Sequence, residues 1–203
     1  MAEQSVSAAA PRGRHAPPLE VRHDRQRARL FAAAAAVFAR SGYADASAEA
    51  IAREAGMSKA TFYEHFDNKE DCLVALFDAA IEEVLAEMRA AGRAHYGAPD
   101  AERVRATIEA FLGALAAFPD QAQTLLVEIV GAGPRALARR DRALDEVASY
   151  IHETTEGLAS YDDAFAIVGA VVELASRQLR TGRPASIRDL EPVVERLVLG
   201  LLQ

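Results

Sequence analysis

The sequence has few of the residues that would place the protein outside a reducing compartment or inside a membrane. It contains one cysteine, Cys72, so no disulfide can form within the chain. No stretch approaches the roughly 18 to 20 uninterrupted apolar residues of a transmembrane helix, and the N-terminus lacks the apolar core of a secretion signal. We therefore expect a soluble, cytoplasmic protein that does not associate with a membrane.

Clusters of β-branched residues are also few and short, which argues against a sheet. Alanine dominates the 203 residues, and the helix formers Ala, Leu, Arg and Glu recur throughout. The predicted fold class is all-α, with an N-terminal three-helix head and a larger C-terminal helical body. We place a flexible arm at residues 1–22, the head at 23–70 and the body at 71–203.

Lysine is scarce as well, because the basic side chains are nearly all Arg and the only lysines are Lys59 and Lys69. The formal net charge of −7 argues at first sight against binding to nucleic acid. Residues 1–71, however, hold ten basic and ten acidic side chains, so the rest of the chain carries the whole acidic excess. A neutral head on an acidic body can still bind phosphate through a local patch.

Residues 47–69, SAEAIAREAGMSKATFYEHFDNK, have the pattern of two short helices joined by a tight turn. Ser47 can cap the first helix, and Ile51 and Ala55 share one face of it. Gly56 can adopt the left-handed conformation that ends a helix. The spacing predicts a helix-turn-helix, a motif that places its second helix in the DNA major groove.

The second helix of this pair begins after the cap Ser58 and separates apolar from polar side chains. Phe62 and Phe66 point inward together. The opposite face carries side chains that can reach phosphates and base edges, namely Lys59, Thr61, Tyr63 and His65. Lys69 follows at the start of the next helix.

From about Arg25 to Phe77 the chain resembles the tetracycline-repressor (TetR) family of transcriptional regulators. The matching segments are RARLFAAAAAVFARSGY, the cap Ser47, AGMSKATFYEHFDNKED and the apolar helix that follows. Ala60 stands where many members carry Gly or Pro, which leaves the base preference open. The resemblance implies DNA contacts, with Tyr63 and Lys69 on phosphates, by Ser47, Ser58, Lys59, Thr61, Tyr63, His65 and Lys69.

The body is predicted as a series of amphipathic helices. The first runs from after Asn68 to near Gly92 and connects the head to the body. Further helices are expected at about 104–118, 120–130, 134–160, 162–180 and 187–202, separated by Gly and Pro.

Broad apolar arcs on the last two helices predict that each packs on its own body and on a second subunit. The alternative, a monomer core, stays open on the residues alone, whereas members of the resembled family dimerise through their last helices. The predicted dimer interface comprises Phe165, Val168, Val172, Ala175, Leu179, Leu190, Val194, Leu197 and Leu201.

Two motifs suggest other chemistry without completing it. Residues 125–136 have the form of a dinucleotide fingerprint but lack neighbouring strands, and Glu128 would interrupt a buried strand. His152 and Glu156 could both ligate a metal at their spacing, although a solvated helix face explains them as well. No nucleophile has a local base, so we expect no catalytic residues, no cofactor and no metal site.

The resemblance implies a ligand-responsive regulator, most often a repressor, that binds a palindromic DNA operator as a homodimer and is released by a small-molecule effector. A single recognition helix touches few base pairs, which independently favours two heads. Residues that could line a ligand cavity are Phe111, Leu115, Leu126, Glu128 and Tyr150. The alternative is a helical protein-interaction module that does not bind DNA. Arg12, Arg14, Arg22 and Arg25 could contact phosphates or form a solvated tail.

Overall fold

The computed structural model describes residues 19–155 and 160–201, and its regular elements there are all helical. This confirms the predicted all-α class. The elements are α1 (Leu19–Asp45), α2 (Ala48–Glu54), α3 (Lys59–His65), α4 (Lys69–Ala94), α5 (Asp100–Ala117), α6 (Pro119–Leu126), the 3-10 helix η1 (Glu128–Gly131), α7 (Pro134–Thr154), α8 (Tyr161–Thr181), the 3-10 helix η2 (Ile187–Leu190) and α9 (Glu191–Leu201).

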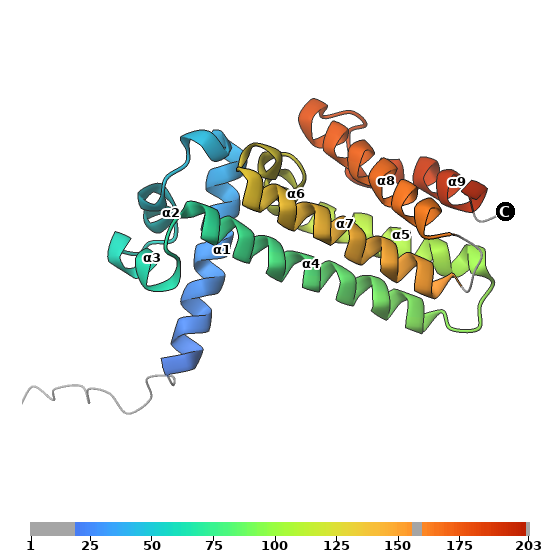
Figure 1. Cartoon of the computed structure of the whole chain (residues 1–203), viewed down its shortest axis with the longest axis horizontal. Helices are drawn as coiled ribbons and strands as arrows, with labels where there is room; N and C mark the ends of the chain where they lie inside the picture. Colours follow the sequence, from blue (N-terminus) through green and yellow to red (C-terminus); the bar gives the residue numbers. More distant parts are fainter. Residues whose placement is uncertain (1–18, 156–159, 202–203) are drawn as a thin grey trace, which may run out of the picture.

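The head consists of α1, α2 and α3 with the start of α4. Helix α1 crosses the end of the molecule, and α2 and α3 pack on its outer side (Figure 1). Helix α1 starts at Leu19, inside the predicted arm, while the rest of that arm lies outside the described residues. Gly42 kinks α1, with a φ of 76°, and the helix then continues to Asp45.

The body is an elongated bundle that α4 joins to the head (Figure 1). Helix α4 packs along α5 and α7, and α7 packs along α8. Helix α9 lies beside α5 and α8 near the far end of the bundle (Figure 1). Among the described residues, no helix combines the length and the apolar character needed to cross a membrane.

Two segments predicted as single helices are each divided by the structure. The helix predicted at 120–130 ends at Leu126 and continues after Val127 as the tighter turn η1. The helix predicted at 187–202 begins as η2 and becomes α9 at Glu191. Pro192, the second residue of α9, has no amide hydrogen to donate to the preceding turn, which accounts for that division.

The core of the head continues into the body. Phe38, Phe62 and Ile51 are fully buried in one cluster that also contains Ile129 of η1 and Ala136 of α7. Such burial contributes roughly 1.5–3 kcal/mol for each large apolar side chain. The head is therefore packed on α6, η1 and the start of α7 as well as being joined to α4.

Candidate nucleic-acid interface and ligand cavity

The turn between α2 and α3 has the capped geometry that the sequence predicts. The Ser47 hydroxyl accepts a hydrogen bond from the Ala50 amide at 3.1 Å, and the Ser58 hydroxyl accepts one from the Thr61 amide at 3.0 Å. Gly56 has a φ of 64°, a conformation that costs glycine little. The two serines thus fix the N-terminal ends of α2 and α3. The hydroxyl of Thr61 lies 3.0 Å from that of Ser58.

Aromatic side chains hold α3 against α1. Phe62 is 0% exposed and Phe66 is 5% exposed, and their ring centroids are 5.6 Å apart. Phe31 of α1 packs on Phe66, and the guanidinium of Arg27 lies 5.1 Å from the centroids of both of these rings. Because this packing fixes α3 from behind, its outer face keeps one orientation.

The outer face of α3 presents Lys59 and Tyr63. Tyr63 is 49% exposed, and the Lys59 side chain is 56% exposed. The Lys59 ammonium lies 3.8 Å from a carboxylate oxygen of Glu49, a separation that leaves only a weak exposed ion pair. These two side chains can reach a phosphate or a base edge without rearrangement of the head.

His65 is turned toward α1 and away from this face. Its ring packs against that of His23, with centroids 4.1 Å apart and the ring planes tilted by 35°, and both of its ring nitrogens are buried without a hydrogen-bond partner. Desolvation, with the neighbouring His23 and Arg27, lowers the pKa of His65 below its ordinary value, and Glu64 opposes this shift. In this arrangement His65 packs α3 on α1, and a contact with DNA would require its ring to leave the site.

Lys69 also has a role within the head. Its ammonium donates hydrogen bonds to the carbonyl oxygens of Tyr43, Ala44 and Ala46 at 2.7, 3.0 and 2.9 Å. It lies 4.5 Å from the Tyr43 ring centroid. Since an ammonium has three donors, these bonds occupy all of them. A phosphate contact by Lys69 would compete with this closure of the end of α1.

Arginines with structural roles in the head were missed from the sequence. Arg29 donates to the Ala55 carbonyl at 2.5 Å and so caps the end of α2. Arg40 pairs with Glu54 at 2.9 Å between α1 and α2. A basic residue that faces the unpaired carbonyls at the end of a helix could have indicated such a role. Predicting it from the sequence, however, requires the position of α1 relative to α2.

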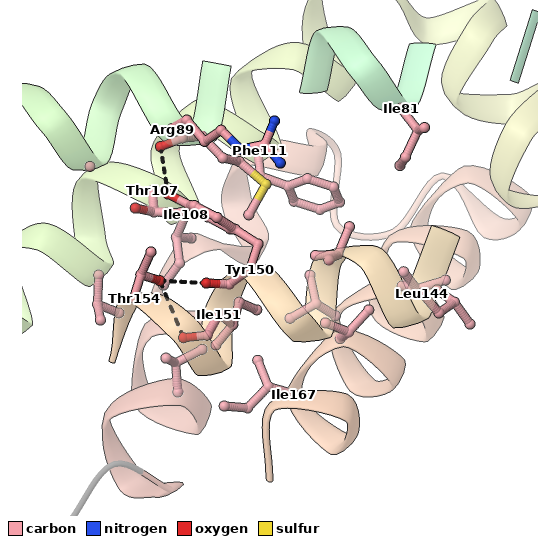
Figure 2. Close-up of a pocket in the computed structure, with 18 of the residues that line it drawn as sticks. Ile81, Arg89, Thr107, Ile108, Phe111, Leu144, Tyr150, Ile151, Thr154 and Ile167 are labelled. Atoms are coloured by element: carbon pink, nitrogen blue, oxygen red, sulfur yellow. Dashed lines mark hydrogen bonds between the residues drawn. The ribbon is translucent and has the colours of Figure 1, made fainter. Parts of the chain in front are cut away.

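The body contains an apolar cavity of about 600 Å³ between α4, α5, α7 and α8. Figure 2 shows Phe111, Ile108, Ile151 and Ile167 around it, with Tyr150 directed toward α4. The Tyr150 hydroxyl donates to the Met88 carbonyl at 3.1 Å, and burial raises the pKa of this hydroxyl. Its size and apolar lining match those of a small-molecule site.

Charged and polar side chains line part of this cavity. Arg89 lies over the Tyr150 ring at 5.8 Å, and Arg103 donates to the Thr154 carbonyl at 3.3 Å. The lining also includes Arg93, Arg140 and Glu153. Four arginines against one glutamate favour an anionic group at the polar side of any occupant.

Three of the five predicted lining residues border this cavity: Phe111, Leu126 and Tyr150. Leu115 borders a second cavity of about 410 Å³ between α4, α5 and α6. Glu128 lies apart from both sets of lining residues, because the chain turns after Leu126 into η1 and directs this side chain toward α1.

Glu128 instead joins the body to the head. Its carboxylate accepts a hydrogen bond from the Tyr43 amide at 3.1 Å, next to the kink at Gly42, and one from Gln123 at 3.3 Å. The buried hydroxyl of Thr124 donates to the Ala35 carbonyl of α1 at 3.1 Å. Helix α6 therefore contacts α1 through polar side chains, whereas its Leu125 and Leu126 line the cavities.

The predicted dimer-interface residues divide into two groups. Val168, Val172, Ala175, Leu190 and Val194 are buried within the chain itself. Leu179 and Leu197 are partly buried against the same core, while Phe165 and Leu201 are exposed. The predicted interface residues thus lie on two sides of each helix, one that covers the body of the same chain and one that faces outward.

The described part of the chain contains no group of three or more metal-ligating side chains. Of the two candidate ligands, His152 lies on α7 and Glu156 lies outside the described residues. Burial raises the pKa of the Cys72 thiol to about 12, so this cysteine stays protonated at neutral pH.

Residues 30–76 match the model of the family described as "Bacterial regulatory proteins, tetR family". Among curated proteins, the chain is 34% identical over 88 residues to the HTH-type transcriptional activator FasR of Mycolicibacterium smegmatis, a match that covers 43% of this chain. The match spans 39% of the length of FasR, about two fifths.

Solved structures share the whole fold. The fatty acid degradation regulator FadR of Bacillus halodurans aligns with a TM-score of 0.73 and 21% identity over 92% of this chain and 97% of that one. FadR of Bacillus subtilis, in complex with stearoyl-CoA, aligns with a TM-score of 0.71 and 21% identity over 85% and 98%. These relatives are all regulators, which is the class of protein that the sequence predicts for this chain.

Proposed function

We propose that this chain is a transcriptional regulator of the TetR family, whose model matches residues 30–76, and that it binds operator DNA as a homodimer. The observation that carries the proposal is the exposed pair Lys59 and Tyr63 on a capped helix that is packed rigidly from behind. A fixed helix with outward polar side chains can enter the major groove, while the phosphate contacts set its position.

The homodimer has a surface available to it on the last two helices. The outer sides of α8 and α9 carry exposed apolar and small residues, including Phe165, Gly169, Val193 and Leu201. A partner that covers this face would remove apolar surface from water and hold two heads at a fixed separation. Two heads at that separation read two half-sites of a palindrome, so discrimination exceeds that of one short helix.

The ligand proposed for the body is an amphipathic molecule with an apolar chain and an anionic group. The apolar lining suits the chain, and the arginines Arg89, Arg93, Arg103 and Arg140 suit the anion. Stearoyl-CoA, which the Bacillus subtilis FadR structure contains, has this combination, so acyl-CoA is the first class of compound to test.

Repression is the proposed direction of control, with release from the operator when the ligand binds. The ligand would favour a state of the body in which the separation of the heads no longer matches the half-sites. Movement could pass through α4 or through α6, since both line the cavity and both contact α1.

The promoter region of the protein's own gene is the first DNA to test, by fluorescence anisotropy with full-length protein. We expect Tyr63→Ala to weaken binding about tenfold, or 1.4 kcal/mol, across sequences. Tyr96→Ala is the matched control, because it makes the same truncation at a tyrosine that is 88% exposed and lies beyond the end of α4, away from the head. Hexadecanoyl-CoA should release the wild-type protein from this DNA.

Three results would contradict the proposal. Equal affinity of wild type and Tyr63→Ala would remove the role of α3, and absence of DNA binding would favour the protein-interaction module. A ligand that binds the body yet leaves DNA affinity unchanged would contradict the coupling. FasR is named an activator, so a promoter–reporter assay separates activation from the proposed repression.

A further inference from the structure

The two apolar cavities of the body share one wall. The cavity of about 600 Å³ and that of about 410 Å³ have five lining residues in common, from α4, α5 and α6. These residues are Phe77, Ile81, Phe111, Leu125 and Leu126. Since each of these residues borders both spaces, single side chains stand between the cavities.

Phe111 is the largest side chain of this wall that is only partly buried. Phe77 is 6% exposed and has the guanidinium of Arg139 at 5.4 Å from its ring centroid, so it is held in place. Phe111 is only partly buried, whereas the next residue of α5, Leu112, is 1% exposed. Its ring projects from α5 into the first cavity (Figure 2).

The two cavities differ in the charge of the side chains that line them. Arginines line the first cavity, whereas the charged side chains that line the second, among the described residues, are Glu83 and Glu87. An anionic group is attracted to the first and repelled by the second. Apart from these two glutamates and Gln121, the second cavity is lined by apolar and small residues, among them Ala110, Gly113 and Ala114. It can therefore accept only the uncharged end of an amphipathic chain.

We propose that the second cavity is the continuation of the ligand site and that Phe111 sets the length of acyl chain that the protein accepts. This inference rests on the proposed function, since it concerns the same ligand. A short chain ends before the Phe111 ring. A longer chain needs the space beyond it, where each further methylene group removed from water strengthens binding by about fourfold.

The test is calorimetric titration of the full-length protein with octanoyl-, dodecanoyl- and hexadecanoyl-CoA. We expect Phe111→Ala to raise the affinity for hexadecanoyl-CoA relative to octanoyl-CoA by about tenfold or more over the wild-type ratio. Phe111→Ala with Ala114→Leu refills the second cavity, so it should return this ratio toward the wild-type value. Phe31→Ala is the matched control, because the same truncation in the head lies far from both sets of lining residues.

The outcomes separate the two proposals. Wild-type protein that binds none of the three compounds would overturn the acyl-CoA assignment and this inference together. Wild-type protein that binds them and leaves DNA, with a length ratio unchanged by Phe111→Ala, would overturn this inference alone. The same would follow if the double variant kept the ratio of the single one. Should Phe111→Ala fail to fold, Phe111→Leu provides a smaller opening, for which a smaller shift in the same direction is expected.

Discussion

The head and the body solve different packing problems with the same kind of helix. In the head, Phe38, Phe62 and Ile51 are completely buried, and polar side chains such as Lys69 are fully used in hydrogen bonds. In the body, Phe111 and Leu126 are only partly buried and border open space. A DNA-binding domain needs one fixed geometry, whereas a ligand site needs space that a ligand can fill. Apolar periodicity alone therefore does not distinguish a filled core from a cavity.

The largest expected effect comes from making the same truncation in both regions. Phe62→Ala should lower the free energy of unfolding by about 3–5 kcal/mol, because it leaves a new cavity in a filled core. Phe111→Ala should cost about 1–2 kcal/mol, since that ring already faces open space. Urea unfolding followed by circular dichroism, at equal protein concentration, measures both. Equal costs would mean that the body is packed as tightly as the head.

The two lysines of the chain provide the next test of this comparison. Lys69→Ala should lower the free energy of unfolding by about 1–3 kcal/mol, because it leaves three carbonyls at the end of α1 without their donor. Lys59→Ala should change it by less than about 0.5 kcal/mol, because Lys59 is exposed.

DNA binding by the same pair then separates structural from direct contacts. Lys59→Ala should reduce the slope of affinity against salt by about 1, with little change in stability. If the Lys69→Ala protein remained fully stable yet lost DNA affinity and salt dependence, Lys69 would make the phosphate contact that the family resemblance implies.

The helix-turn-helix could be predicted because its determinants are local. Ser47, Gly56 and Ser58 act on backbone groups within a few residues of themselves, so their spacing in the sequence is enough. The roles of Lys69 and His65 could not be predicted in this way. Lys69 binds carbonyls 23 to 26 residues away, and His65 packs on His23 of another helix. Which side of α3 is covered depends on where α1 crosses it.

The ligand site shows the same limit of prediction from the sequence, here for two residues that are close together in the chain. Leu126 and Glu128 are two residues apart and were both predicted to line the cavity. The helix was expected to continue to Val130, but it ends at Leu126, and η1 turns Glu128 toward Tyr43. A change of helix type that the apolar pattern does not reveal therefore moves a residue from one site to another. The division of α8 and α9 into inner and outer sides likewise needs the neighbouring helices.

A smaller effect is expected at the contact that joins the two regions. Glu128→Gln keeps the shape of the side chain but removes the charge that strengthens its hydrogen bond with the Tyr43 amide. We expect ligand affinity and DNA affinity, measured separately, to stay within about twofold of wild type. The coupling free energy between ligand binding and DNA binding should be about 1 kcal/mol smaller than in wild type. The ligand should therefore weaken DNA binding roughly fivefold less than it does in wild type.

The control for this prediction is Glu109→Gln, an exposed charge removed from α5. Unchanged coupling in Glu128→Gln would show that the signal passes through α4 and that the α6 contact is only structural. A loss of DNA affinity without ligand would show that Glu128 supports the head itself.

The smallest expected effect is a pH dependence confined to the head. The pKa of His65 is lowered in the folded protein, first by desolvation and then by His23 and Arg27 of α1, while Glu64 on its own helix acts in the opposite sense. The unfolded chain, with a histidine pKa of about 6.5, therefore binds a proton more readily than the folded one. The stability contributed by His65 is complete above about pH 6.5 and is lost as the pH falls below it.

Comparing wild type with His65→Gln by thermal unfolding between pH 7.5 and about pH 5 isolates this contribution, because carboxylates that titrate nearby are common to both proteins. The unfolding midpoint of the wild type should decrease relative to that of the variant as the pH falls. A difference for His65→Gln that is constant with pH would mean that the ring can leave its buried position on protonation. In that case His65 would be free to face DNA as the sequence predicts, and the head would be less rigid than its packing indicates.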